Sequence, residues 1–423
     1  MTHPLTAIPT AFHAGNPVGI TSVCSAHPMV IEAALRLAKE TGELALIEAT
    51  CNQVNQEGGY TGMTPADFRA FVENIAGKIG LATDRIILGG DHLGPNPWKD
   101  LPAEEAMAKA EVMIAQFSAA GFTKLHLDTS MGCAGEPVAL LDETTAERAA
   151  RLAVVAEAAK AAVDPVYVIG TEVPVPGGAL EDLGELAVTT PEAVARTYDV
   201  HRDAFAAAGA QEAFSRIIAL VVQPGVEFGH TNVIHFEPTK ARNLSGSLSG
   251  MPGIVFEAHS TDYQKPEGLG ALVENGFAIL KVGPWLTFAL REALYALDSV
   301  ADVLDGHPPR GGLMAAMDVV MLAAPGNWKK YYDGDARELW LQRHFSYSDR
   351  VRYYWPEPKA EAAVAELHER LSETVIPETV RSQFLRGRTS GASANEILIA
   401  AVQDVLRQYH RACRGALSES KQN

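Results

Sequence analysis

The sequence is short of cysteine, of positive charge and of long apolar runs. Four cysteines in 423 residues, without CxxC spacing, argue against a disulfide scaffold and favour a reduced compartment. No window reaches the ~18 uninterrupted apolar residues of a membrane helix, and residues 1–5 show no basic segment leading into an apolar core. We therefore expect a cytoplasmic protein that does not span a membrane.

The deficit of positive charge restricts the ligands. Lys and Arg number 35 against 52 Asp and Glu, which gives a formal net charge of −17. A chain this acidic is a poor partner for nucleic acid or for anionic membranes. A phosphate group on a small ligand would need a local cation or a set of backbone amides.

What the sequence does contain, up to about residue 298, is a regular alternation of short apolar runs with amphipathic segments. This is the rhythm of repeated βα units. The predicted strands are 19–24, 45–50, 85–91, 124–128, 166–172, 217–223, 253–259 and 278–283. Eight strands close a (β/α)8 TIM barrel, so the predicted fold class is α/β.

Beyond residue 300 this alternation stops. Helical patterns cover 313–324, 360–372, 377–385 and 394–414, and the polar tail 418–423 is expected to fray. We therefore predict a barrel of residues 1–300 that carries the active site. Residues 301–423 are predicted to be a mostly helical C-terminal extension packed on it.

Residues 86–95 (IILGGDHLGP) carry the clearest chemical signal. An apolar strand runs directly into Asp91 and His92, and the carboxyl ends of barrel strands form the catalytic mouth. Neighbouring side chains on a strand face opposite ways, so both can serve one site only if the chain begins to turn there. An ordinary strand-end hydrogen bond is the alternative interpretation.

Histidine and carboxylate recur at the ends of other predicted strands. Four such residues, His92, Glu172, His230 and His259, could surround one divalent ion. Imidazole ligands suit Zn²⁺ best, with Mn²⁺, Co²⁺ or Fe²⁺ as alternatives, and the ion would polarise a substrate carbonyl for aldol chemistry. Alternatively, each histidine is a hydrogen-bonded loop residue.

The remaining candidates divide into proton carriers and substrate contacts. Asp91 is the first candidate for general acid/base work, Asp128 is the second, and Glu48 ends a neighbouring strand. The predicted substrate-binding residues are Asn52, Gln53, Ser260, Thr261, Asp262, Lys281 and Gly283. Those after the last two strands occupy the usual phosphate site of a barrel, although ordinary turn chemistry would also explain them.

Lys281 also admits a rival mechanism, in which a lysine forms a Schiff base with the ketone. A bound metal ion and an imine would both act as the electron sink of the same reaction, and one site does not need two. The Schiff-base mechanism is therefore disfavoured. Lys124 is excluded as such a nucleophile, because it begins its strand and would face the opposite end of the barrel.

Long motifs carry a resemblance to a known family. They are residues 19–28 (GITSVCSAHP), 48–56 (EATCNQVNQ), 89–95 (GGDHLGP), 126–131 (HLDTSM), 170–174 (GTEVP), 257–264 (EAHSTDYQ) and 347–356 (YSDRVRYYWP). Over essentially its whole length the chain resembles the class II D-tagatose-1,6-bisphosphate aldolase accessory subunits of the GatZ and KbaZ type. That family is related to the class II aldolases, which are zinc-dependent barrels.

The resemblance implies roles for individual residues. It makes His92 a metal ligand and Asp91 the proton carrier, and it matches Glu172, His230 and His259 to further ligands. The phosphate loop after the last histidine has glycines in the aldolases where this chain has Ser260 and Thr261, so the phosphate contacts are expected to differ.

The resemblance also implies a function. The reaction expected is C4 epimerisation of D-tagatose 6-phosphate to D-fructose 6-phosphate, in galactitol or tagatose catabolism. The alternative is a D-tagatose-1,6-bisphosphate aldolase component, as a non-catalytic subunit that stabilises a separate class II aldolase. Some relatives are named kinases, but no GxxxxGK[ST] loop is present. The expected partners are a phosphorylated ketose and either further copies of the chain or an aldolase subunit.

Overall fold

The computed structural model describes residues 2–170, 186–372, 374–386 and 393–414. Eight parallel strands form a closed barrel in the order β1-β10-β9-β6-β5-β4-β3-β2. They are β1 (Ile20–Cys24), β2 (Ala45–Thr50), β3 (Ile86–Leu93), β4 (Lys124–Leu127), β5 (Val166–Ile169), β6 (Ile217–Val222), β9 (Val255–Ala258) and β10 (Phe277–Val282). The predicted barrel and all eight of its strands are confirmed.

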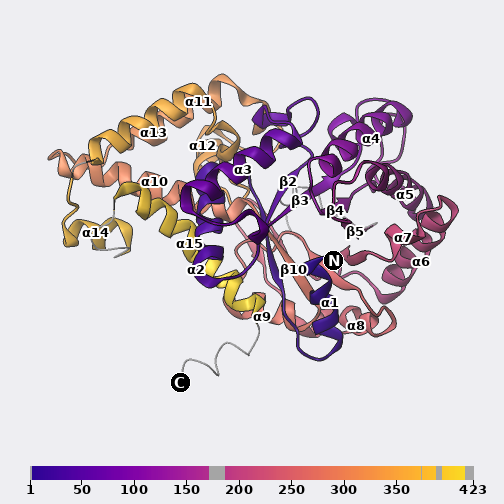
Figure 1. Cartoon of the computed structure of the whole chain (residues 1–423). Coiled ribbons are helices and arrows are strands. Elements are labelled where there is room, and N and C mark those ends of the chain that lie inside the picture. The colour runs from indigo at the N-terminus through magenta and orange to yellow at the C-terminus, as the bar shows by residue number, and fades with distance from the viewer. Residues whose placement is uncertain (1, 171–185, 373, 387–392, 415–423) are drawn as a thin grey trace.

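Helices surround the barrel (Figure 1). They are α2 (Pro28–Thr41), α3 (Pro65–Ile79), α4 (Ala103–Ala119), α5 (Asp142–Ala159), α6 (Pro191–Ala207), α8 (Pro238–Ser247), α9 (Pro266–Glu274) and α10 (Pro284–Leu304), with the shorter α1 (Ala7–His13) and α7 (Gln211–Phe214). Local chemistry explains the starts of several. The Thr64 hydroxyl and the Asp67 carboxylate form a capping box at α3, and Thr190 caps α6.

Five further helices follow α10 and lie on the left of Figure 1, with α15 beside α2. They are α11 (Gly312–Ala323), α12 (Ala336–Phe345), α13 (Pro358–Leu371), α14 (Glu378–Leu385) and α15 (Ala394–Cys413), and the short 3-10 helix η7 (Arg350–Tyr354) lies between α12 and α13. The sequence patterns predicted four of these helices and missed α12. None of the helices within the described residues is both long and apolar enough to cross a lipid bilayer.

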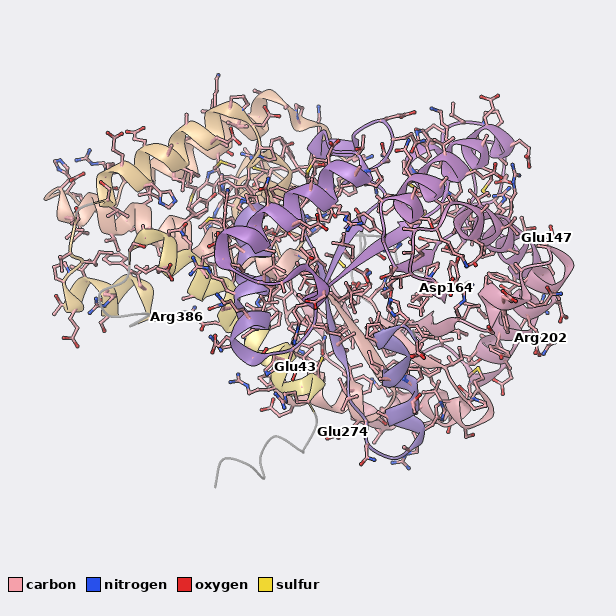
Figure 2. All side chains as sticks on the ribbon, viewed as in Figure 1. Glu43, Glu147, Asp164, Arg202, Glu274 and Arg386 are labelled. Carbon is pink, nitrogen blue, oxygen red and sulfur yellow. The ribbon has the colours of Figure 1, made fainter. Side chains whose placement is uncertain are left out.

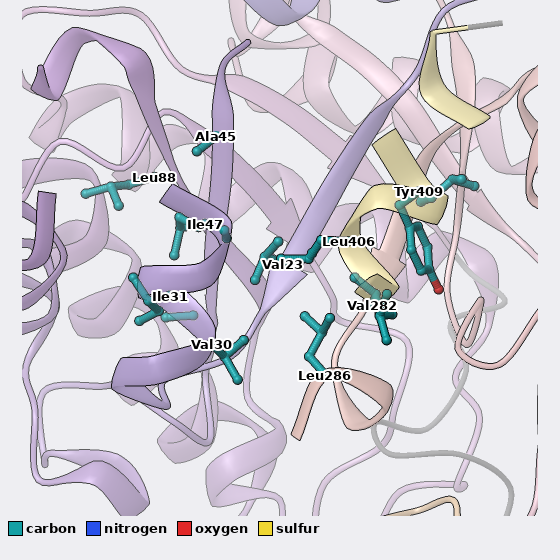
Figure 3. Packing of buried hydrophobic residues seen from close by; sticks show 14 of the residues in the cluster. Val23, Val30, Ile31, Ala45, Ile47, Leu88, Val282, Leu286, Leu406 and Tyr409 are labelled. Carbon is teal, nitrogen blue, oxygen red and sulfur yellow. The ribbon is translucent and has the colours of Figure 1, made fainter. Parts of the chain in front are cut away.

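The last helix returns to the barrel. Helix α15 packs against α2, α9 and α10 and on β1. Figure 3 shows Leu406 and Tyr409 of α15 close to Val23 of β1 and Leu286 of α10. All four side chains are buried and belong to the largest apolar core. Helix α15 therefore contacts β1 and three of the outer helices at once, and it ties the C-terminal extension to the barrel.

The outside of the molecule is strongly charged. Figure 2 labels six charged side chains at its periphery, all of them exposed: Glu43, Glu147, Asp164, Arg202, Glu274 and Arg386.

A short antiparallel hairpin of β7 (Glu227–Phe228) and β8 (Val233–Ile234) follows β6 and was not predicted. This hairpin brings Phe228 to the mouth of the barrel.

Candidate metal and substrate site

Asp91 and His92 line the same cavity, because the backbone turns at His92. His92 has φ +49°, in the left-handed region, and the pairing of β3 with β4 shifts register between Gly90 and Leu93. A non-glycine residue in that region is strained by about 1–3 kcal/mol and is found mainly at functional sites. The chain therefore turns at the end of β3, which is what allows two neighbouring side chains to face one site.

Four buried side chains meet at this end of the barrel. Asp91, His92, His126 and His259 each offer one ligand atom, and these atoms all lie within 4.8 Å of one another. The three imidazole rings are mutually close: the centroid distances are 4.9 Å for His92–His259, 5.1 Å for His92–His126 and 5.2 Å for His126–His259. This is the donor set of a transition-metal site.

Each imidazole is held by a carboxylate through one nitrogen. The distances are 2.7 Å from His92 Nδ1 to Asp128 Oδ2, 2.9 Å from His126 Nδ1 to Asp91 Oδ1, and 3.0 Å from His259 Nε2 to Glu257 Oε1. An ionised carboxylate only accepts hydrogen bonds, so the bonded nitrogens of His92 and His259 donate to it and their opposite nitrogens are left for a metal ion. His126 Nδ1 also accepts a hydrogen bond from the backbone N–H of His92, at 3.2 Å. The free nitrogen of His126, Nε2, is buried without a hydrogen-bond partner. A metal ion would satisfy it, so the residues present fit such an ion.

The charges at the site keep Asp91 ionised. Burial acts to raise the pKa of Asp91, but the charges of His92 and Lys281 and the hydrogen bond with His126 hold it well below its usual value. Burial lowers the pKa of His259 to about 3, so that ring is neutral. Burial also acts to raise the pKa of Asp128, but its hydrogen bond with His92 brings it down to about 2.

A buried ionic network lies beneath the imidazoles. Lys281 Nζ lies 2.6 Å from Glu48 Oε2 and 2.7 Å from Asp91 Oδ1, and Lys124 Nζ lies 2.6 Å from Glu48 Oε1 and 2.7 Å from Glu257 Oε2. Gly89 makes room for it, because a Cβ there would lie 2.7 Å from Glu48 Cγ. The network connects β2, β3, β4, β9 and β10 inside the barrel.

The two lysines differ from the sequence-based expectations. Lys124 lies inside the barrel within this network and does not face the far end, because its side chain extends inward between two carboxylates. Burial acts to lower the pKa of Lys281, but the charges of Asp91 and Glu48 hold it well above its usual value. A protonated, doubly paired lysine is not a nucleophile, so the structure gives the Schiff-base mechanism no support.

The predicted substrate contacts divide into two sets. Asn52, Gln53, Ser260, Asp262, Lys281 and Gly283 line the cavity that Asp91, His92 and His259 share. Thr261 does not line it: its hydroxyl donates to the Lys281 carbonyl at 2.5 Å and lies 3.2 Å from the Tyr409 hydroxyl. Thr261 therefore ties the loop after β9 to its surroundings.

The amides at the start of α10 are already occupied. Asp262 Oδ1 accepts hydrogen bonds from the backbone N–H groups of Gly283 at 3.0 Å and Trp285 at 2.8 Å. The predicted phosphate position at this helix N-terminus is thus filled by the chain's own carboxylate. Burial raises the pKa of Asp262 to about 6.

The other two predicted metal ligands differ in what can be said of them. Glu172 lies outside the described residues. His230 follows the first strand of the β7–β8 hairpin, where its Nδ1 lies 3.1 Å from Ser346 Oγ and its ring packs edge-on against Tyr332 at 5.1 Å. His230 belongs to neither group of metal-competent side chains found among the described residues, because the hairpin carries it toward the C-terminal extension.

His126 is the ligand candidate that the sequence analysis missed. It precedes Asp128 by two residues, as Glu257 precedes His259. Since side chains two apart on a strand share a face, each pair points into the barrel together. A polar pair at this spacing in an otherwise apolar strand was the sequence signal that could have pointed to His126.

Three further residues that the sequence analysis did not place at the site, Tyr60, Arg352 and Tyr353, also line the cavity.

A closed parallel barrel with a buried histidine and aspartate group at its carboxyl end defines a barrel enzyme with a candidate metal centre. The chain belongs to the D-tagatose-1,6-bisphosphate aldolase subunit GatZ/KbaZ-like family, whose model matches residues 5–414.

Two similar proteins cover almost the whole chain. It is 54% identical over 421 residues to a D-tagatose 6-phosphate 4-epimerase of Agrobacterium fabrum (strain C58 / ATCC 33970), which covers 97% of this chain and 99% of that protein. A crystal structure of a "probable tagatose 6 phosphate kinase" from Sinorhizobium meliloti 1021 is 57% identical, with a TM-score of 0.86, and covers 93% of this chain and 100% of that one.

Proposed function

We propose that this protein is a metal-dependent D-tagatose 6-phosphate 4-epimerase that breaks and remakes the C3–C4 bond. The observation that carries the proposal is the buried group of three imidazoles and Asp91 within 4.8 Å. The 54% identity to a protein of that name, over nearly the whole chain, supports the choice of substrate.

In this proposal the ion is held by His92 Nε2, His126 Nε2 and His259 Nδ1, with Asp91 beside it. Three imidazole ligands favour Zn²⁺, with Mn²⁺, Co²⁺ or Fe²⁺ as alternatives. When bound, the ion acts as a Lewis acid that stabilises negative charge on the ketose carbonyl oxygen. Asp128 and Glu257 orient two of the rings, and metal-binding histidines typically need such partners.

Asp91 is the proposed proton carrier. As an ionised carboxylate it accepts the proton of the C4 hydroxyl while the C3–C4 bond breaks and its electron pair stays with the three-carbon ketone fragment. The other fragment is an aldehyde, which turns over its other face before the bond re-forms and Asp91 returns the proton. Lys281 and His126 hold the carboxylate in place, and Glu48 in turn holds Lys281.

Asp128 is less suited to carry the proton. Its Oδ2 is bound to His92 and its Oδ1 accepts from the Ser130 hydroxyl at 2.9 Å. Both oxygens of Asp128 are therefore engaged, whereas the contacts of Asp91 with His126 and Lys281 are both made by Oδ1. We assign Asp128 the orientation of His92.

We also retain the proposed division into a barrel of residues 1–300 and an extension of 301–423, with α15 returning to the barrel. A kinase activity is not proposed, because the chain contains no GxxxxGK[ST] loop. An accessory role beside a separate aldolase would leave the imidazole group without a function. The experiment must distinguish this role from the epimerase activity.

The experiment incubates purified, metal-loaded protein with D-tagatose 6-phosphate in D₂O and follows the sugar by ¹H NMR. We expect D-fructose 6-phosphate without deuterium at C4, because the C4–H bond stays intact. Asp91→Asn should retain the metal on its three imidazoles and lose about 10²- to 10⁴-fold in turnover. Unchanged substrate with bound metal confirmed contradicts the proposal, and deuterium at C4 contradicts the bond-cleavage route. Equal support of an aldolase by wild type and His92→Ala would favour the accessory role.

A further inference from the structure

Arg352 reaches the cavity from the C-terminal extension. Helix η7 places Arg352 and Tyr353 in the lining of the same cavity as Asp91, His92 and His259. Arg352 is half-buried there. Its charge therefore faces the site from a part of the chain remote in sequence from the barrel strands.

Arg352 is hydrogen-bonded to uncharged oxygen atoms. Its guanidinium donates to the carbonyl oxygens of Ser348 and Asp349 and, at 2.8 Å, to the Tyr353 hydroxyl, and no described carboxylate forms an ion pair with it. The cavity's lysine, Lys281, is paired with Glu48 and Asp91. In a chain of net charge −17, a cation left unpaired beside a cavity indicates an anionic ligand.

The turn that carries Arg352 is firmly fixed. Asp349, which precedes η7, accepts from Arg291 Nε at 2.8 Å and from the Thr287 hydroxyl at 2.7 Å, both on α10. Arg350 does not line the cavity: its guanidinium lies 3.4 Å from the centroid of the Tyr331 ring and 5.0 Å from that of Tyr353. Arg352 is thus preorganised, so little conformational entropy is lost when a ligand binds.

We propose that Arg352, together with the hydroxyls of Tyr60 and Tyr353, binds the phosphate monoester of the substrate. A guanidinium presents a planar pair of N–H donors that matches two phosphate oxygens. The rings of Tyr60 and Tyr353 meet edge to face at 4.9 Å, and both line the cavity beside Arg352. The alternative position at the start of α10 is closed by Asp262.

This inference rests on the proposed function and names its phosphate site, so its test has one readout that does not depend on turnover. The variants are Arg352→Gln, Arg352→Lys and Tyr60→Phe. The matched control is Arg337→Gln, which removes the same charge from an exposed position on α12.

For D-tagatose 6-phosphate we expect Arg352→Gln to lower kcat/KM by about 10- to 100-fold, mainly through KM, as the loss of a charged hydrogen bond predicts. Arg352→Lys and Tyr60→Phe should fall between this variant and wild type, and all should retain full metal content. The Arg337→Gln control should match wild type. A wild-type KM in Arg352→Gln overturns the inference. If that variant does not fold, a wild-type KM in both Arg352→Lys and Tyr60→Phe overturns it instead.

The second readout is binding of inorganic phosphate to the full-length, metal-loaded protein by calorimetry. We expect binding by wild type and Arg337→Gln, and at least about tenfold weaker binding by Arg352→Gln. If wild type binds phosphate through Arg352 but does not epimerise the sugar phosphate, the site stands and the proposed function fails. Phosphate binding that is equal in Arg352→Gln and wild type overturns the site.

Discussion

At the scale of single residues, two histidines that look alike in the sequence have opposite surroundings. His126 is tied to Asp91 and leaves a buried nitrogen unpaired among the candidate ligands, whereas His230 lies beside Ser346 and Tyr332. We expect His126→Ala to lose both bound metal and turnover, and His230→Ala to keep its metal. Elemental analysis of the two purified variants checks this. Full metal content in His126→Ala would show that the group is assembled differently.

The sequence indicates most of this group, but not all of it. Asp91 and His92 stand out because polarity changes abruptly at a strand end, and His259 does so for the same reason. His126 lies inside an apolar strand, where the pattern alone does not say whether its face points into the barrel or outward. His230 was expected in the group because residues after a strand were assumed to stay at the mouth, and the hairpin breaks that assumption.

At the scale of helices and strands, prediction works where periodicity and caps agree. The barrel strands are short and almost entirely buried, and two of the helices between them, α3 and α6, begin at a Thr-Pro pair. Helix α12 lacks a clear apolar face and depends on a capping box between Asp335 and Glu338, and the strands of the hairpin have two residues each. Such elements form through local capping and tertiary contacts, which leave little periodic trace.

The attachment of η7 to α10 gives a prediction at this scale. Asp349→Asn keeps a residue type that tolerates the left-handed backbone at φ +43° but removes the charge that pairs with buried Arg291. We expect the free energy of unfolding to fall by on the order of 3 kcal/mol, because an uncompensated charge is left in the core. Urea unfolding measures this, with exposed Asp333→Asn as control. Equal stability of the two variants would mean that the pair does not anchor the turn.

At the scale of the whole molecule, buried neutral histidines make stability depend on pH. His201 on α6 is fully buried, and burial lowers its pKa from 6.5 to about 4. Below pH 6.5 the unfolded chain takes up a proton that the folded chain refuses, so the free energy of unfolding decreases as the pH falls from 6.5 toward 4.

We expect this group to account for about 2 kcal/mol of the loss of stability between pH 7 and pH 5. Urea titrations at both pH values compare wild type with His201→Gln, in which this part of the decline should disappear. Exposed His307→Gln should decline as wild type does. A decline in His201→Gln as steep as in wild type would assign the acid sensitivity to other groups.

The hydroxyl of Tyr409, near the end of α15, donates to the carbonyl oxygen of Thr261, two residues beyond His259. The segment that follows a candidate ligand is therefore secured by a helix that comes more than 130 residues later in the chain. During synthesis the barrel strands emerge well before α15, so the loop after β9 gains this support only once α15 has been made. Chains truncated anywhere before α15 should therefore be inert, with no partly working shorter form.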